Sequence, residues 1–368
     1  MDLARGLRCL AAGQLDQAEE HFARAHRRAP DQPEVLFALG RERLRKGRVD
    51  EAEPLLRGAW DRDRTLGAAA AGLARCLGVA GDQHAASHAI LDEAMVDPVH
   101  AAEPGLHVVR GEIYLEEERV AEARAAFEEA ERRLAGSRRD APVTRSAVAA
   151  GLARVYNLDG IELGRASRTE EALFAFKRAA DLDPEWSGPV VNMGVAFAQL
   201  GRAARARSCY ERALAADPEN PVARFNLANL TRDGGDLARA EADYEAVLEL
   251  DAEYPGARAA LADVLLRRGE AARAVAHLER LATEHPDDAG VWFQLGVAHD
   301  QGGDPGAAER SLRRALALDQ DHVPACCRLA ALLTRDGRYL EAAALARRAH
   351  ELDPARAQSY LGSRPSEP

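Results

Sequence analysis

The sequence has few aromatic residues, almost no lysine and no long apolar run. Of its 368 residues, 5% are aromatic, and Lys46 and Lys177 are the only lysines among 49 basic residues. The formal net charge of -11 argues against a general nucleic-acid-binding protein, which needs a basic face for phosphates. No segment is apolar enough to span a membrane, and no basic-then-apolar leader opens the chain. We therefore expect a cytoplasmic protein with no nucleic-acid or membrane partner, and the arginine and alanine excess suggests a bacterial source.

The motifs of common enzymes are also missing. There is no glycine-rich phosphate loop, dinucleotide fingerprint, nucleophile elbow or His-Glu-x-x-His sequence, so we predict no catalytic activity and no cofactor. His84 and His88, flanked by Asp82 and Asp92, have a spacing that suits a metal ion, but no third ligand is placed and we predict no metal site. The cysteines form no Cys-x-x-Cys pair, and we expect them to be buried on helices, except Cys327, which we expect in a groove. They are Cys9, Cys76, Cys209, Cys326 and Cys327.

What the sequence does contain is one repeated pattern, with a period of 34 residues wherever the spacing is unbroken. Ten alanines share one position of it: Ala18, Ala52, Ala86, Ala123, Ala172, Ala206, Ala240, Ala274, Ala308 and Ala342. Twelve residues before each alanine stands a small residue: Gly6, Gly40, Ala74, Gly111, Gly160, Gly194, Ala228, Ala262, Gly296 and Ala330. Four residues after it, Ala346 excepted, stands a large apolar one: Phe22, Leu56, Ile90, Phe127, Phe176, Tyr210, Tyr244, Leu278 and Leu312. The two columns of small residues predict two helices that cross closely in every repeat.

Each repeat also carries signals that end its helices. Five residues before the alanine stands a helix breaker, replaced twice by Glu118 and Ser167: Gly13, Gly47, Gly81, Gly201, Gly235, Gly269, Gly303 and Gly337. Glycine ends the first helix because it adopts the left-handed cap conformation easily. Proline ends the second helix, mostly as Asp-Pro, because it cannot continue a helix. A helix pair of this size cannot bury its apolar face alone, so the stable object is a stacked array.

These columns resemble the tetratricopeptide repeat, and the resemblance covers almost the whole chain. Residues 192–218 and 293–319 match its pattern nearly position for position. We count ten repeats: residues 1–32, 33–66, 67–100, 104–137, 153–186, 187–220, 221–254, 255–288, 289–322 and 323–356. The resemblance implies an all-α fold, a right-handed superhelical solenoid of antiparallel helix pairs whose first helices line a concave groove.

One interruption divides the array. Residues 138–152 separate four repeats (1–137) from six (153–356), and we expect the first helix of the fifth repeat to be extended, from about Pro142 to Leu163. The segment is either a tolerated insertion or a hinge between two lobes. Residues 357–368 are expected to form a short cap, with Tyr360 and Leu361 on the tenth repeat, and then a disordered tail.

The resemblance also implies where a ligand binds, since certain positions of the first helices face the groove. These positions hold Phe37, Arg41, Asn157, Ile161, Asn192, Phe225, Asn226, Asn229, Arg232, Asp263, Arg267, Phe293, Gln294, Asp300, Cys327, Arg328 and Arg335. Carboxamides both donate to and accept from a peptide backbone, and phenylalanines supply contact area, although these asparagines could instead satisfy neighbouring backbone groups. The carboxylate-clamp pattern of chaperone-binding relatives is not matched, because Val191, Val195 and Ala260 replace its polar residues.

Two functional hypotheses follow from this pattern. The first is a non-catalytic scaffold or adaptor that binds a protein or extended peptide in the groove. The second is a regulatory sensor whose superhelix changes on binding and controls an effector protein, with residues 138–152 as the hinge. The first helix carries Leu3, Leu7 and Leu10, and if nothing covers this stripe the chain could also self-associate through it.

Overall fold

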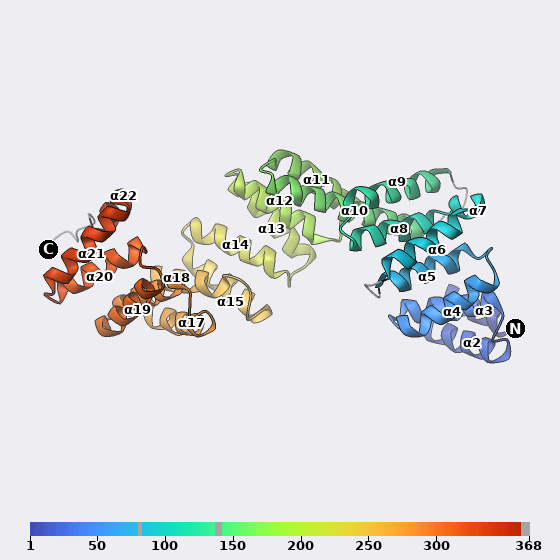
Figure 1. The fold of residues 1–368 in the computed structure, drawn as a ribbon, viewed down its shortest axis with the longest axis horizontal. Helices are drawn as coiled ribbons and strands as arrows, with labels where there is room; N and C mark the ends of the chain where they lie inside the picture. The colour runs from blue at the N-terminus through green and yellow to red at the C-terminus, as the bar shows by residue number, and fades with distance from the viewer. Residues whose placement is uncertain (80–82, 137–141, 362–368) are drawn as a thin grey trace. The chain divides into compact units, whose positions relative to one another are not determined.

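The computed structural model describes residues 1–79, 83–136 and 142–361, and these residues form 22 α-helices. The chain divides into two compact units, Met1–Ala196 and Phe197–Pro368, which we call the N-terminal and C-terminal units. Consecutive helices pack side by side in each unit (Figure 1). No helix of the described residues is long and apolar enough to cross a membrane.

The helices of the N-terminal unit are α1 (Asp2–Ala11), α2 (Leu15–Arg28), α3 (Pro33–Arg45), α4 (Val49–Arg62), α5 (Gly67–Val79), α6 (His84–Met95), α7 (Pro98–Ala101), α8 (Pro104–Glu116), α9 (Val120–Gly136), α10 (Pro142–Arg165) and α11 (Thr169–Leu182). Helix α12 (Ser187–Gln199) spans the division between the units. The C-terminal unit continues with α13 (Ala203–Ala216), α14 (Pro221–Asp233), α15 (Leu237–Leu250), α16 (Ala257–Arg267), α17 (Ala271–Glu284), α18 (Ala289–Gln301), α19 (Pro305–Leu318), α20 (Val323–Arg335), α21 (Tyr339–Leu352) and α22 (Pro354–Leu361).

The fold is all-α and consists of sequential antiparallel helix pairs, as predicted. Ten pairs correspond to the ten repeats, while α7 and α22 stand outside them. Helix α10, with 24 residues, begins at Pro142 and is the extended first helix expected for the fifth repeat. The proposed division into four and six repeats stays a prediction; the boundary of the compact units lies at Ala196, inside α12.

The small and large columns meet inside the helix pairs of the first, second, fourth, fifth and ninth repeats, where the large side chain lies against the glycine. All ten glycines and alanines of the first-helix column are buried. A Cβ atom on Gly160 would lie 2.5 Å from the Phe176 ring, so only hydrogen fits there. Leu56 sits between Gly40 of its own repeat and Gly72 of the next, 2.8 and 3.1 Å from the Cβ positions of the two glycines. The large side chain therefore fixes both the pair and the stack.

The predicted helix breakers adopt the left-handed conformation. Seven of the eight glycines have φ values between 69° and 88°, and Gly81 lies outside the described residues. The two exceptions in the pattern, Glu118 and Ser167, adopt the same conformation, at φ 59° and 61°. The chain is therefore strained at these two positions, where a side chain replaces the glycine.

The third repeat departs from the alanine column. Ala86 is exposed, whereas Ser87 and Leu91 are fully buried in the positions that we expected for Ala86 and Ile90. The Ser87 hydroxyl donates a hydrogen bond of 2.6 Å to the carbonyl oxygen of Ala74 on the facing helix. The buried face of α6 is thus one residue later than the period predicts, because serine can approach α5 closely and satisfy its own hydroxyl.

The two ends of the array differ in how they are covered. At the C-terminus α22 packs on α20 and α21, and its buried residue is Ala357. Tyr360, which we expected to pack on the tenth repeat, is 40% exposed. Leu361 and the tail lie outside the described side chains. Ala357 clusters with Cys326 and Cys327, so the prediction that Cys327 faces a groove is wrong. At the N-terminus Leu7 is exposed, while Leu3 and Leu10 pack on the Phe22 cluster.

Candidate functional site

Most of the residues predicted for ligand binding lie on α14, α16, α18 and α20, the first helices of four successive repeats in the C-terminal unit. We call the face that these residues form the first-helix surface: Phe225, Asn226, Asn229, Arg232, Asp263, Arg267, Phe293, Gln294, Asp300, Arg328 and Arg335. Neighbouring first helices are in contact along this series. Within the C-terminal unit the repeat therefore brings chemically varied side chains onto adjacent helices.

The aromatic part of the first-helix surface is centred on Phe225. Its half-buried ring lies 5.1 Å from the ring of Tyr254 and 5.7 Å from that of Tyr244, between ring centroids. Tyr244 is fully buried, and this burial raises the pKa of its phenol to about 12. It donates a hydrogen bond of 2.6 Å to Oδ1 of Asn229. The half-buried Phe225 ring thus packs beside a buried, hydrogen-bonded ring.

The asparagines on α14 keep unused hydrogen-bonding groups. Nδ2 of Asn226 donates to the Val222 carbonyl oxygen at 2.8 Å, within the same helix. Among the described residues, Oδ1 of Asn226 and Nδ2 of Asn229 have no partner. The two amides thus stabilise their surroundings and still offer one acceptor and one donor.

The charged part of the surface consists mostly of paired groups. Nε of Arg232 donates to Asp233 at 3.0 Å, and Arg267 lies 4.0 Å from Asp263 on α16. Asp300 on α18 binds Arg335 and lies 4.0 Å from Arg328, both on α20. Only the Arg267–Asp263 pair is exposed on both sides, whereas the Asp300 side chain is 15% exposed and that of Arg232 is 25% exposed. A ligand carboxylate could therefore compete for Arg267 at little cost.

The first-helix surface also includes Phe293 and Gln294 on α18. The ring centroid of Phe293 lies 5.0 Å from that of His322, whose Nδ1 accepts a hydrogen bond from the Ala325 N–H and caps α20. Gln294 is half-buried and, in the described ranges, its amide has no hydrogen-bond partner. Phe293 thus supplies a second aromatic contact two repeats beyond Phe225.

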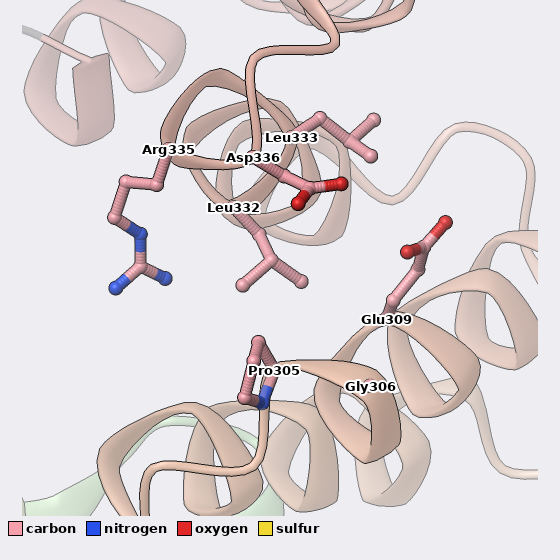
Figure 2. A pocket seen from close by; sticks show the side chains of 7 residues that line it. All are labelled: Pro305, Gly306, Glu309, Leu332, Leu333, Arg335 and Asp336. Atoms are coloured by element: carbon pink, nitrogen blue, oxygen red, sulfur yellow. The ribbon is translucent and has the colours of Figure 1, made fainter.

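A cavity of about 360 Å³ opens beside Arg335, as Figure 2 shows. Leu332 points from α20 toward Pro305 at the start of α19, and Glu309 lies to one side. A hydrogen bond from Arg313 lowers the pKa of Glu309 below its ordinary value, burial opposes this, and Arg338 lowers it further. The cavity thus places the apolar side chains of Leu332 and Pro305 between the Arg335 guanidinium and the Glu309 carboxylate, whose lowered pKa keeps it ionised.

Apart from Cys327, which is buried on α20, the other predicted residues lie in the N-terminal unit. The guanidinium of Arg41 lies 5.5 Å from the centre of the Phe37 ring on α3. Nδ2 of Asn192 donates to Oδ1 of Asn157 at 2.9 Å, which links the first helices of the fifth and sixth repeats. Asn157 is only 7% exposed, so its role is largely structural.

Asn157 nevertheless borders a hollow of about 520 Å³ that sequence reasoning only partly anticipated. Ile161, a groove position, lines it together with Trp186, Arg154 and Arg165. Neither arginine forms an ion pair in the part of the chain that the structure describes. Trp186 stands in the turn between α11 and α12, outside the repeat positions that were considered, and its aromatic character was the only signal for it.

Of the two histidines with metal-like spacing, His88 is engaged otherwise, while Nδ1 of His84 is buried without a hydrogen-bond partner among the described residues. His88 lies 3.1 Å from Glu117 through Nε2 and stacks on Tyr114, with ring centroids 4.8 Å apart. Asp92 accepts a hydrogen bond from Arg110, and Asp82 lies outside the described residues. Over residues 1–79, 83–136 and 142–361, no group of three His, Cys, Asp or Glu side chains could hold a metal ion.

Comparison with known families identifies the repeats. Three family models, all described as tetratricopeptide repeat, match residues 10–76 and 232–295, residues 191–258, and residues 289–322. No curated protein matches the sequence.

Solved structures with the same kind of fold share little sequence with this chain. The type IV pilus biogenesis factor PilW is 16% identical, with 57% of this chain and 98% of PilW covered at a TM-score of 0.51. PilF of Pseudomonas aeruginosa is also 16% identical, with coverages of 58% and 98% and a TM-score of 0.50. The Cut9–Hcn1 hetero-tetramer structure of APC/C covers 97% of this chain and 95% of its own at 13% identity, with a TM-score of 0.47. At these identities the likeness concerns the fold alone.

Proposed function

Because this chain belongs to the tetratricopeptide repeat family, whose domains generally mediate protein–protein interactions, we propose that it is a non-catalytic scaffold or adaptor that binds a protein or extended peptide along its first-helix surface. The observation that carries this proposal is the pair of amides on α14, beside Phe225, which keep one acceptor and one donor without a partner among the described residues. A peptide backbone needs that combination, and the neighbouring aromatic ring supplies an apolar anchor.

Two arginines of α20 extend the same argument. Arg328 and Arg335 share a single carboxylate, Asp300, so two cations compete for one anion. An acidic side chain of a ligand would relieve this imbalance. We therefore expect the bound segment to run from the aromatic end at Phe225 to a basic end beside Arg335.

Affinity capture with the intact chain tests the proposal. The triple variant Phe225→Ala, Asn226→Ala, Asn229→Ala should lose a stoichiometric partner that the wild-type chain retains, because it removes the anchor and both amides. A second variant, Gln294→Ala, removes a side chain that has no hydrogen-bond partner among the described residues, so it should weaken the same complex while leaving the helical circular dichroism unchanged. Tyr339→Ala, which removes a 67% exposed aromatic ring on α21, is the matched control. Retention of the partner by a folded triple variant would refute the proposal.

A further inference from the structure

The hollow of about 520 Å³ beside Asn157 lies in the N-terminal unit, whereas the first-helix surface lies in the C-terminal unit. One face of α10 forms its long side, because the lining residues of this helix follow the spacing i, i+3, i+4, i+7, i+8 and i+11. They are Arg154, Asn157, Leu158, Ile161, Glu162 and Arg165. Leu115 and Glu118 near the end of α8, Val120 at the start of α9 and Trp186 before α12 complete the lining.

One end of the hollow presents hydrogen-bond donors. Asn157 is 7% exposed; its Oδ1 accepts from Asn192, whereas its Nδ2 has no partner among the described residues. The indole Nε1 of Trp186 would lie 2.7 Å from a Cβ atom on Gly188, so the ring packs on the first turn of α12, and its N–H also has no described partner. Arg154 forms no ion pair in the part of the chain that the structure describes. A buried donor without a partner is costly, so this end suits an anionic acceptor.

The opposite end presents two carboxylates. Successive first helices run in the same direction, because one antiparallel helix separates them. The turn after α8, which holds Glu118, therefore lies beside the end of α10, and Trp186, just before α12, lies at the other end of the hollow. Neither Glu118 nor Glu162 forms an ion pair with a residue of the described ranges, although the adjacent Arg119 is paired twice. Arg165 is the cation at this end, and it too is unpaired there.

Glu118 holds its place at an energetic cost. It stands where eight repeats have glycine, and its φ of 59° is a left-handed conformation that a side chain disfavours. The stack does not require a carboxylate at this position, since glycine serves there in those eight repeats. Strained residues cluster at ligand sites, so the strain favours a binding role for the Glu118 carboxylate.

The charges of the lining sum to zero, since two arginines face two glutamates. Their arrangement, and not their total, must therefore select a ligand. Glu162 lies eight residues after Arg154, which is about 12 Å along an α-helix. An extended chain covers that distance in roughly three to four residues. Leu158 and Ile161 lie between the two charges, so the middle of the hollow is apolar.

We propose that this hollow binds an extended segment of a partner protein in which an apolar residue stands between an acidic and a basic residue, with the two charges roughly three to four residues apart. The acidic side chain pairs with Arg154, and the apolar side chain packs on Leu158 and Ile161. The basic side chain pairs with Glu118 and Glu162. This is a second site, in the other compact unit, so it and the first-helix surface can fail independently.

Synthetic peptides test the proposal with the intact chain, by calorimetry and by the fluorescence of Trp186. Each peptide has a central Leu with Glu and Arg about four residues apart around it, in either order, and the order that binds more tightly is the matched peptide. Replacing both charged residues by Gln should weaken binding by roughly tenfold or more. Peptides with Glu at both positions, or Arg at both, should also bind more weakly, because one end then meets a like charge. Trp186→Phe should abolish the fluorescence change.

Two arginines of the same helix face separate the arrangement of charge from its amount. Arg154→Gln should weaken binding of the matched peptide by roughly tenfold, and Arg154→Glu should make the chain prefer the peptide with Arg at both positions. Arg165→Gln is the matched control, because it makes the same charge change in the same hollow. It should leave binding unchanged or tighter, since it removes the cation from the acidic end. Both arginines are exposed and unpaired among the described residues, so the circular dichroism should not change.

Four results would overturn the proposal. If Arg154→Gln and Arg165→Gln weaken binding equally, the attraction is diffuse charge. If the peptide with Glu at both positions binds as tightly as the matched one, the acidic end of the hollow reads nothing. If binding is lost in the Phe225, Asn226 and Asn229 variant but kept in Arg154→Gln, the peptide occupies the first-helix surface. If no peptide releases heat or changes the fluorescence of Trp186, the hollow does not bind such segments.

Discussion

At the scale of single residues, the stack is controlled by side-chain size and by backbone handedness. Glycine is required at Gly160 because of contact, since the Phe176 ring occupies the place of a Cβ atom. It is required at Gly201 for a different reason: its φ of 69° suits glycine, although nothing lies within 4 Å of its Cβ position. Glu118 and Ser167 show that the second requirement can be violated at an energetic cost.

Replacing Ser167 by glycine should therefore stabilise the protein. Glycine adopts the left-handed conformation without the strain that the serine side chain causes there. This gain outweighs the extra conformational freedom of glycine in the unfolded chain, so we expect the free energy of unfolding to rise by about 0.5–1 kcal/mol. Urea denaturation followed by circular dichroism measures it. Gly201→Ala is the converse control and should lose about 1 kcal/mol; a lower midpoint for Ser167→Gly would show that the serine side chain has a stabilising role.

At the scale of helices, the sequence predicted which segments are helical and where they end, because glycine, proline and the apolar columns act locally. It did not predict the face of α6, since one residue of rotation moves Ala86 out of the core and Ser87 into it while the period stays intact. Cys327 was misplaced for a related reason: its environment depends on α22, a helix outside the repeat. For the site, the sequence named residues of the first-helix surface, but the hydrogen bonds of Asn229 depend on side-chain geometry that spacing does not determine.

Helix α22 should protect the two cysteines of α20. Burial raises the pKa of the Cys326 and Cys327 thiols, and both pack with Ala357 of α22. Truncation after Asp353 should therefore expose them, and their reaction with a disulfide reagent should accelerate by roughly tenfold or more. The buried Cys76, in the N-terminal unit, serves as the internal control and should react at an unchanged rate. Equal rates in both chains would mean that α22 does not cover α20 in solution.

At the scale of the whole molecule, ion pairs between consecutive second helices supplement the apolar stack. Arg48, in the turn before α4, forms an ion pair with Glu19 on α2, with 2.5 Å between guanidinium nitrogen and carboxylate oxygen. Arg338, in the turn before α21, forms the equivalent pair with Glu309 on α19 at 2.9 Å. Both glutamates are partly shielded from solvent, so these links are weakened by acid more than by salt.

The resulting pH dependence can be predicted in sign. The pKa of Glu309 is lowered in the folded chain, so its contribution to stability is complete above the unfolded pKa and disappears as the pH falls below about 4. Glu309→Gln should therefore reduce the free energy of unfolding by up to about 1 kcal/mol at pH 7. At pH 3 the variant and the wild-type chain should unfold at the same urea concentration. A difference that persists in acid would indicate a packing defect and not a lost ion pair.

The contact between the small residue of a first helix and the large residue of its second helix also restricts how such a chain can evolve by recombination. Every phenylalanine in the large column faces a glycine. In the four repeats with alanine in the small column, the corresponding large residue is Tyr244, Leu278 or Ala346, or, in the third repeat, the buried Leu91 one residue later. A crossover that joins a first helix with alanine in the small column to a second helix with phenylalanine in the large column would place the phenylalanine against a methyl group. A crossover between repeats keeps each matched pair together, so the heritable module of this chain is the whole hairpin.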